Sequence, residues 1–231
     1  MAKSKIIKDL ANSTVDTMTA LKRAKVLFAE LGNVELINWV NYELAGYPTD
    51  VELPDYRVEC GALKGSYIKG SMAQHMKWTD VSIPLGTMPE DLKNNLLEIE
   101  FRESIGALKQ LSENNEKGLL EKTIPADFFP VIAKFNKDPY MFIVAARVVV
   151  GAQCIPNIFS VIENRLLDAL ILLEKEFGNL DELDLDVTEK TPDELQNIIQ
   201  NLCVVIYHDQ SVTIGNNNKI KGTHIASVLE E

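Results

Sequence analysis

The clearest candidate for chemistry in this sequence is a carboxylate that stands among aromatic residues. Glu43 stands one helical turn after Trp39 and next to Tyr42, and Tyr47 follows shortly afterwards. A carboxylate near aromatic rings can have a raised pKa, which suits it to proton transfer as a general acid or base. The alternative is structural, because Arg57 follows closely and a buried charge must be paired. We favour the structural interpretation.

The cysteines and histidines give little support for a metal site or a nucleophile. They are scattered, with no CxxC pair and no metal-ligand spacing: Cys60, Cys154, Cys203, His75, His208 and His224. No phosphate-binding loop, dinucleotide fingerprint, nucleophile elbow, HExxH or EF-hand pattern occurs. We therefore predict no catalytic residue, no metal and no cofactor. A few scattered thiols, together with an N-terminus that lacks the apolar region of a signal peptide, predict a cytoplasmic protein.

Composition narrows the class of partner. The chain has 231 residues, which suits one domain with a tail or two small domains. Its 23 basic and 34 acidic residues give a net charge of −11, which disfavours nucleic acid as the main ligand. No apolar run reaches the roughly 18 residues of a membrane span. These features disfavour nucleic acid and a membrane as partners.

Two helices are predicted near the N-terminus. Apolar residues recur at spacings of three and four over residues 15–31, and either Ser13 or Thr14 can cap this helix. Gly32 can end it, and Asn33 can cap a second helix that ends at Gly46. The connection is so short that the two helices should form a hairpin or a sharp corner.

The middle of the chain changes character. Residues 56–62 and 78–83 alternate with a period of two, which predicts a small antiparallel sheet of two or three strands. After Pro89 the helical period returns, predicting a helix over about 92–113. A short helix is predicted over 125–136.

Residues 140–150 are nearly all apolar, so they fit either a buried strand or a buried helix. The β-branched residues at the end of this run favour a strand. Arg147 lies within the run and must be paired if it is buried, with Glu163 or Asp168 as the expected partner.

The strongest helical pattern covers residues 156–177, and Gly178 is its expected cap. Asn164 and Arg165 lie on this helix and can point away from its apolar stripe, toward solvent or a partner. An acidic linker is predicted over 179–190. The expected organisation is therefore a domain over 1–178, this linker, and a C-terminal region over 191–231.

The C-terminal region has signals of its own. Thr191 and Glu194 match a capping box, which predicts a short helix to about Leu202. Residues 203–207 resemble a strand, and 212–225 fit either an edge hairpin or a rung of a β-solenoid. One rung cannot bury its apolar face alone, so it would have to stack on the parent domain or on a second copy. The second choice predicts a homo-oligomer formed through Ile214, Asn216, Asn217, Asn218, Ile220 and Ile225.

The stretch 20–57 resembles the N-terminal signature of the AbiTii domain, which is named after an abortive-infection component of bacteria. In that signature a helix ends in Leu-Gly, a Trp follows, and then come Glu-Leu-x-Gly-Tyr and Leu-Pro-x-Tyr-Arg. The matching positions are Leu31, Gly32, Trp39, Glu43, Leu44, Gly46, Tyr47, Leu53, Pro54, Tyr56 and Arg57. The resemblance extends loosely over about 10–178, and the middle of the chain diverges.

The resemblance implies bacterial phage defence, and it implies no reaction. In physical terms, we expect Glu43 to pair with Arg57 while aromatic side chains pack around them. The residues predicted to form this structural signature, or a binding site, are Trp39, Tyr42, Glu43, Gly46, Tyr47, Pro54, Tyr56 and Arg57.

The sequence thus predicts an α+β fold that is mainly helical, with an N-terminal helical hairpin, a small antiparallel sheet, long helices and a C-terminal β tail. The predicted function is a non-enzymatic module of a phage-defence system that assembles through its tail and binds a host or phage protein. The alternative is a toxin-like enzymatic effector whose active site is assembled by the fold.

Overall fold

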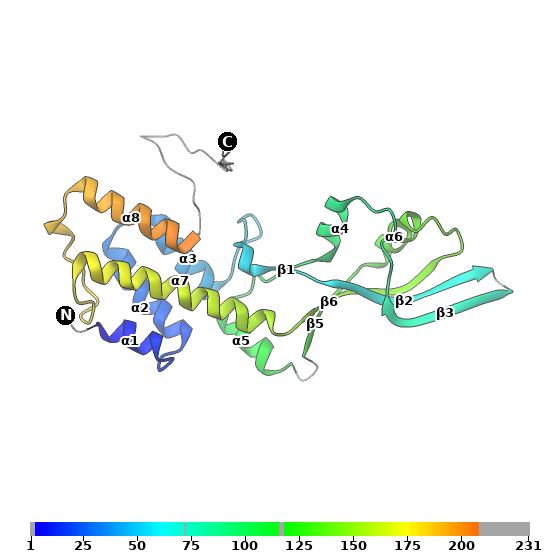
Figure 1. The fold of residues 1–231 in the computed structure, drawn as a ribbon, viewed down its shortest axis with the longest axis horizontal. Coiled ribbons are helices and arrows are strands. Elements are labelled where there is room, and N and C mark those ends of the chain that lie inside the picture. Colours follow the sequence, from blue (N-terminus) through cyan, green and yellow to red (C-terminus); the bar gives the residue numbers. More distant parts are fainter. Residues whose placement is uncertain (1–2, 72, 116–117, 208–231) are drawn as a thin grey trace, which may run out of the picture. The chain divides into compact units, whose positions relative to one another are not determined.

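The computed structural model describes residues 3–71, 73–115 and 118–207, and confirms an α+β fold that is mainly helical (Figure 1). The described helices and strands, in chain order, are α1 (Lys5–Ala11), α2 (Thr17–Glu30), α3 (Val34–Ala45), β1 (Val58–Cys60), β2 (Ala62–Ser71), β3 (Gln74–Ser82), α4 (Glu90–Leu97), β4 (Glu98–Glu100), α5 (Ile105–Glu113), β5 (Leu119–Thr123), α6 (Phe129–Phe135), β6 (Phe142–Gly151), α7 (Cys154–Phe177) and α8 (Pro192–Tyr207). Three short 3₁₀ helices are η1 (Asp55–Arg57), η2 (Ala126–Phe128) and η3 (Val187–Glu189).

The chain divides into two compact units. Unit 1 combines residues 1–40 with 163–231, and unit 2 is the continuous segment 41–162. Both boundaries fall inside helices, so α3 and α7 each contribute to both units. The boundaries that the sequence suggests at residues 178 and 190 stay predictions.

The helices of unit 1 pack through apolar stripes that are fully removed from water. In α2 and α7 the stripes repeat every three or four residues, as predicted, and comprise Ala20, Leu21, Ala24, Leu27, Phe28, Leu166, Ala169, Leu170 and Leu173. The cap of α2 differs from the expectation: Asp16, and neither Ser13 nor Thr14, accepts a hydrogen bond from the Thr19 amide at 2.8 Å. Gly32 has the positive φ of a helix end, and the Asn33 side chain caps α3 by accepting from the Leu36 amide.

Helix α8 corrects the prediction for residues 203–207. The capping box is confirmed, because the Thr191 amide donates to Glu194 at 2.9 Å and the Glu194 amide donates back to Thr191. The helix then continues to Tyr207 and includes the run that resembled a strand. The reason is burial at helical spacing: Ile198, Leu202 and Ile206 lie four residues apart on one buried face, and this packing outweighs β propensity.

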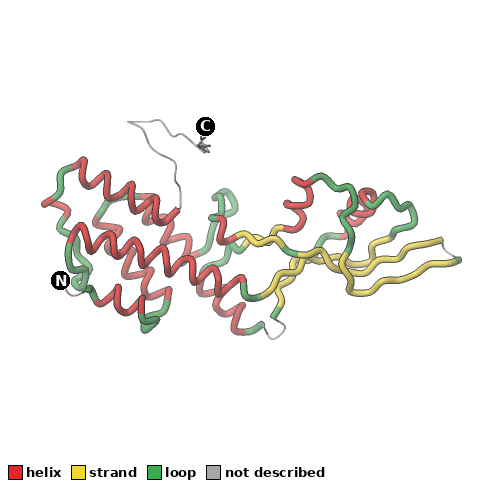
Figure 2. Tube along the Cα trace, in the orientation of Figure 1, coloured by secondary structure: helices red, strands yellow, loops and turns green. Residues whose placement is uncertain are grey.

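Unit 2 is built on a four-stranded antiparallel sheet in the order β3-β2-β6-β5 (Figure 2). Residues 142–151 form strand β6, so the apolar run 140–150 is mainly a strand, as its β-branched residues favoured. The close register of β2 and β6 requires glycine at residue 65, where a Cβ would overlap the backbone of Ala145. Helix α6 packs against β6, inside the range where a short helix was predicted.

A second, two-stranded sheet corrects two further predictions. The helix predicted over 92–113 is interrupted, because β4 leaves the helical path and pairs with β1. A new helix, α5, starts only after Ser104 caps it by accepting from the Ala107 amide. Tyr56 lies in the 3₁₀ turn η1, so the strand predicted from residue 56 starts at Val58.

Candidate functional site

The aromatic-carboxylate motif is formed in unit 2 by Tyr42, Glu43, Tyr47, Tyr56 and Arg57. Glu43 lies in the last turn of α3, which ends at Gly46 with a φ of +100°. A Cβ at this glycine would approach the carbonyl oxygen of Arg102 to 2.9 Å, and the next amide, that of Tyr47, donates to the same oxygen at 2.7 Å. The chain therefore leaves the helix tightly against residues 101–104.

The centre of the motif is a fully buried ion pair. The Arg57 guanidinium donates to the Glu43 carboxylate, and both side chains are 0% exposed. The other terminal nitrogen of Arg57 donates to the backbone oxygens of Phe101, at 2.9 Å, and Glu103, at 2.6 Å. The predicted pairing of Glu43 with Arg57 is thus confirmed, and the arginine also ties α3 to residues 101–103.

Two tyrosines complete the shell of the carboxylate. The hydroxyls of Tyr47 and Tyr56 each donate to Glu43 Oε1 at 2.6 Å. The Arg57 guanidinium carbon lies 5.0 Å from the centre of the Tyr47 ring, which adds a cation–π contact. Burial raises the pKa of Tyr47 far above its ordinary value, and the negative Glu43 raises it further. Tyr47 therefore stays a hydrogen-bond donor at every physiological pH.

This geometry gives the cluster a structural role. Both oxygens of the carboxylate are occupied by donors from the chain itself, and a substrate has no route to a group with no exposed surface. A general acid or base must come within hydrogen-bond distance of its substrate. The ion pair instead fixes the path of the chain from α3 into η1 and β1.

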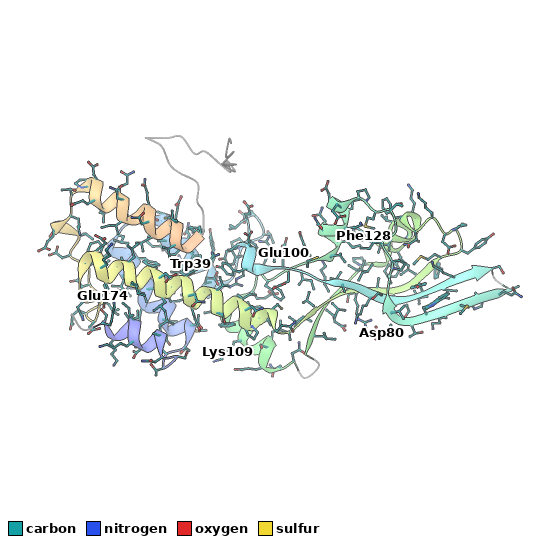
Figure 3. All side chains as sticks on the ribbon, viewed as in Figure 1. Trp39, Asp80, Glu100, Lys109, Phe128 and Glu174 are labelled. Atoms are coloured by element: carbon teal, nitrogen blue, oxygen red, sulfur yellow. The ribbon has the colours of Figure 1, made fainter. Side chains whose placement is uncertain are left out.

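The other members of the signature have separate positions. Tyr42 is half-buried, with its ring 5.3 Å from that of Tyr47, and Pro54 accepts the Arg57 amide in η1. Trp39 is buried on α3 within unit 1 (Figure 3). The use of any of them as a binding site stays a prediction.

The predicted oligomerisation residues of the tail lie outside the residues that the structure describes: Ile214, Asn216, Asn217, Asn218, Ile220 and Ile225.

Three arginines take roles that sequence reasoning missed. Arg147 is half-buried on β6 and pairs with Asp80 and Glu121, so the expected partners Glu163 and Asp168 are wrong. Arg165 is buried instead of facing solvent, and it donates to the Ile206 carbonyl at 2.6 Å, near the end of α8.

The third is Arg102, which pairs with Glu100 and donates to the backbone oxygens of Pro48 and Val51. It has the same kinds of partner as Arg57 but is partly exposed. Apart from the pair Arg102–Glu100, these contacts join segments that are distant in sequence, so no local pattern predicts them.

A second polar cluster holds the N-terminus in unit 1. Glu174 on α7 accepts from the Lys3 ammonium at 2.6 Å, from the Ser4 amide and from the Ser4 hydroxyl. Desolvation raises the pKa of Glu174, but these bonds outweigh it and lower the pKa to about 2. Ser4 is fully buried, and its hydroxyl also accepts from the Leu180 amide. The cluster therefore fastens the residues just before α1 to α7 and to the segment that follows it.

Within 3–71, 73–115 and 118–207, no group of three or more His, Cys, Asp or Glu side chains is placed to hold a metal ion. None of the helices found there has the length and the apolar composition needed to cross a bilayer.

The chain was compared with known proteins. The AbiTii family model matches residues 4–198, which is most of the chain. No curated protein and no solved structure matches significantly.

Proposed function

The chain belongs to the AbiTii family, which implies a role in abortive-infection phage defence, and we propose that it acts there as a non-enzymatic interaction module. It binds a host or phage protein and forms homo-oligomers through its C-terminal tail. Its output is an assembly and not a chemical product.

The observation that carries this proposal is the burial of the signature pair Glu43–Arg57. These two charged residues are the members of the signature best suited to catalysis, and in the fold they stabilise the turn between α3 and β1. Residues that maintain a fold are the ones a family of binding modules would share. Contact with a partner then falls to surface residues, and unit 2 exposes several large apolar side chains, among them Phe128, Tyr140 and Phe142.

Phage plaquing tests the proposal. Bacteria that express the full chain should form fewer or smaller plaques than bacteria with an empty vector. Glu43→Gln keeps the shape of the cluster, and removal of its charge lowers stability. If this variant remains folded, we expect it to keep its protection, since the pair does no chemistry. A folded Glu43→Gln protein that loses all protection would favour a toxin-like enzyme instead.

Assembly is tested in the same full chain. The double variant Ile214→Ser, Ile220→Ser removes the apolar side chains that the tail would stack. Light scattering should show an oligomer for the original chain and a smaller particle for this variant, and protection should fall with it. Equal particle masses would remove assembly through the tail from the proposal. As a matched control, Val204→Ser and Ile171→Ser alter exposed apolar side chains of α8 and α7, and the oligomer should persist.

A further inference from the structure

Helix α4 has an unusual environment in unit 2, because none of its residues is buried. Its apolar side faces a groove of about 360 Å³ whose other wall is formed by η2 and α6. The residues that line this groove are mostly apolar: Met88, Leu92, Leu96, Ile124, Pro125, Phe128, Val131 and Ile132, with Asn95, Lys122 and Thr123. Lys122 contributes mainly its aliphatic stem, because its ammonium donates to the Glu98 carbonyl.

The walls of the groove indicate the size of its occupant. Leu92, Phe128 and Val131 stay 47%, 52% and 44% exposed, on opposite sides of the opening. A site for a small apolar molecule would enclose these side chains. An open groove with half-exposed apolar walls is instead covered from outside by a segment of a macromolecule, as amphipathic helices cover grooves between helices.

The charged residues next to the groove indicate which charge its occupant should carry. Asp91 precedes Leu92 on α4, and Asp127 precedes Phe128 in η2. Both are exposed, and neither makes an ion pair with any residue in the described part of the chain. Glu90 in the same turn of α4 is neutralised by Lys93. Lys122 is therefore the one charged residue among the described residues that line the groove, and its ammonium is held by a carbonyl, whereas Asp91 and Asp127, next to lining residues in the sequence, are negative.

We propose that this groove, between α4 and η2–α6, binds an amphipathic helix of a partner protein whose apolar stripe is flanked by lysine or arginine. The inference rests on the proposed function and names the chemistry of the partner. A second copy of this chain is a poor occupant here, because its net charge of −11 would be brought against Asp91 and Asp127.

Peptide binding to the full chain tests the proposal. Three fluorescein-labelled peptides of equal length serve as probes: a Leu/Lys helix with one apolar stripe, the same helix with Glu in place of Lys, and the Leu/Lys composition with the stripe scrambled. At about 0.15 M salt, where distant charges are screened, fluorescence anisotropy should show saturable binding of the first peptide. The Glu and scrambled peptides should bind at least tenfold more weakly.

Variants locate the binding site. Leu92→Gln and Val131→Gln alter exposed side chains, so the fold should persist, and each should weaken binding of the Leu/Lys peptide by about tenfold. Converting Asp91 and Asp127 together to asparagine should weaken it several-fold. Helix α5 supplies the matched controls: Leu111 and Glu113 are equally exposed but line no part of the groove. Leu111→Gln and Glu113→Gln should leave binding within twofold of the original.

The results separate the groove from the broader function. Equal binding of the scrambled peptide, tighter binding of the Glu peptide, or equal losses in the α5 controls would each overturn the groove assignment. The plaque assay is read independently. If Leu92→Gln abolishes peptide binding and leaves protection intact, the groove is not the surface used in defence, and the proposed function stands without it. Parallel loss of binding and protection supports both.

Discussion

Replacing Arg57 by methionine removes the centre of the buried cluster while keeping a side chain of similar length. The change leaves the Glu43 carboxylate without its cation in a place with no exposed surface. It also takes the donor away from the carbonyls of Phe101 and Glu103. The hydroxyls of Tyr47 and Tyr56 remain and offset only part of this loss.

The magnitude follows from burial. Removing one member of a buried ion pair costs about 3–5 kcal/mol, and each unsatisfied carbonyl adds about 1 kcal/mol. We expect Arg57→Met to lower the free energy of unfolding by about 5–7 kcal/mol, out of roughly 5–15 kcal/mol for a whole protein. Arg57→Lys keeps the charge but loses the planar fork of donors. It should cost less, so it remains measurable if the methionine variant is largely unfolded.

Arg102 provides the matched control. It also bonds one carboxylate and two backbone carbonyls, but its side chain is 26% exposed and water can replace it. Arg102→Met should cost about 1 kcal/mol or less. Urea unfolding, followed by circular dichroism and by tryptophan fluorescence, gives these free energies. Equal losses for the two methionine variants would refute the claim that burial determines the value of the Arg57 pair.

Three further perturbations follow from the structure. The pKa of Glu174 is lowered to about 2, so the stability that its carboxylate contributes is fully present above the ordinary pKa of 4.5 and is lost as the pH falls toward 2. In urea unfolding, Glu174→Gln should therefore lower the free energy of unfolding by up to about 3 kcal/mol at pH 7 and by almost nothing near pH 2. Arg165→Met removes the donor to the Ile206 carbonyl, so hydrogen exchange should speed up selectively in the last turns of α8, while equal acceleration throughout unit 1 would argue against a local role. Gly65→Ala should lower the stability more than Gly32→Ala, because a Cβ at residue 65 meets the backbone of β6, whereas a Cβ at residue 32 meets nothing and is opposed only by the positive φ. Thermal unfolding should give the lower midpoint for Gly65→Ala, and the reverse order would contradict the close approach of β2 and β6.

Sequence reasoning succeeded where the decisive interactions are local. The capping box at Thr191 and Glu194 needs only four consecutive residues, and the glycines that end α2 and α3 act within one turn. The pair Glu43–Arg57 is also near in sequence, and the buried setting predicted from its aromatic neighbours is what the structure shows.

It failed where contacts between segments distant in sequence determine the structure. The helical period through residues 92–113 looks continuous, yet β4 interrupts it because β1 offers a partner for its backbone. Arg147 faces two acids of other strands that only the sheet register brings near. The groove beside α4 could not be predicted either, since it requires two segments separated by about 30 residues, α4 and η2–α6, to line the same opening.

The division of unit 1 has a consequence for synthesis of the protein on the ribosome. The first forty residues of unit 1 are made before unit 2, and the rest of unit 1, with most of α7 and all of α8, is made after it. At about 5–20 residues per second that interval lasts about 6–25 s. During it the apolar stripe of α2 lacks the residues of unit 1 that are made after unit 2, whereas unit 2 is continuous and can fold first. The interval is when the nascent chain exposes the most apolar surface, so the speed of translation across residues 41–162 should influence the yield of folded protein.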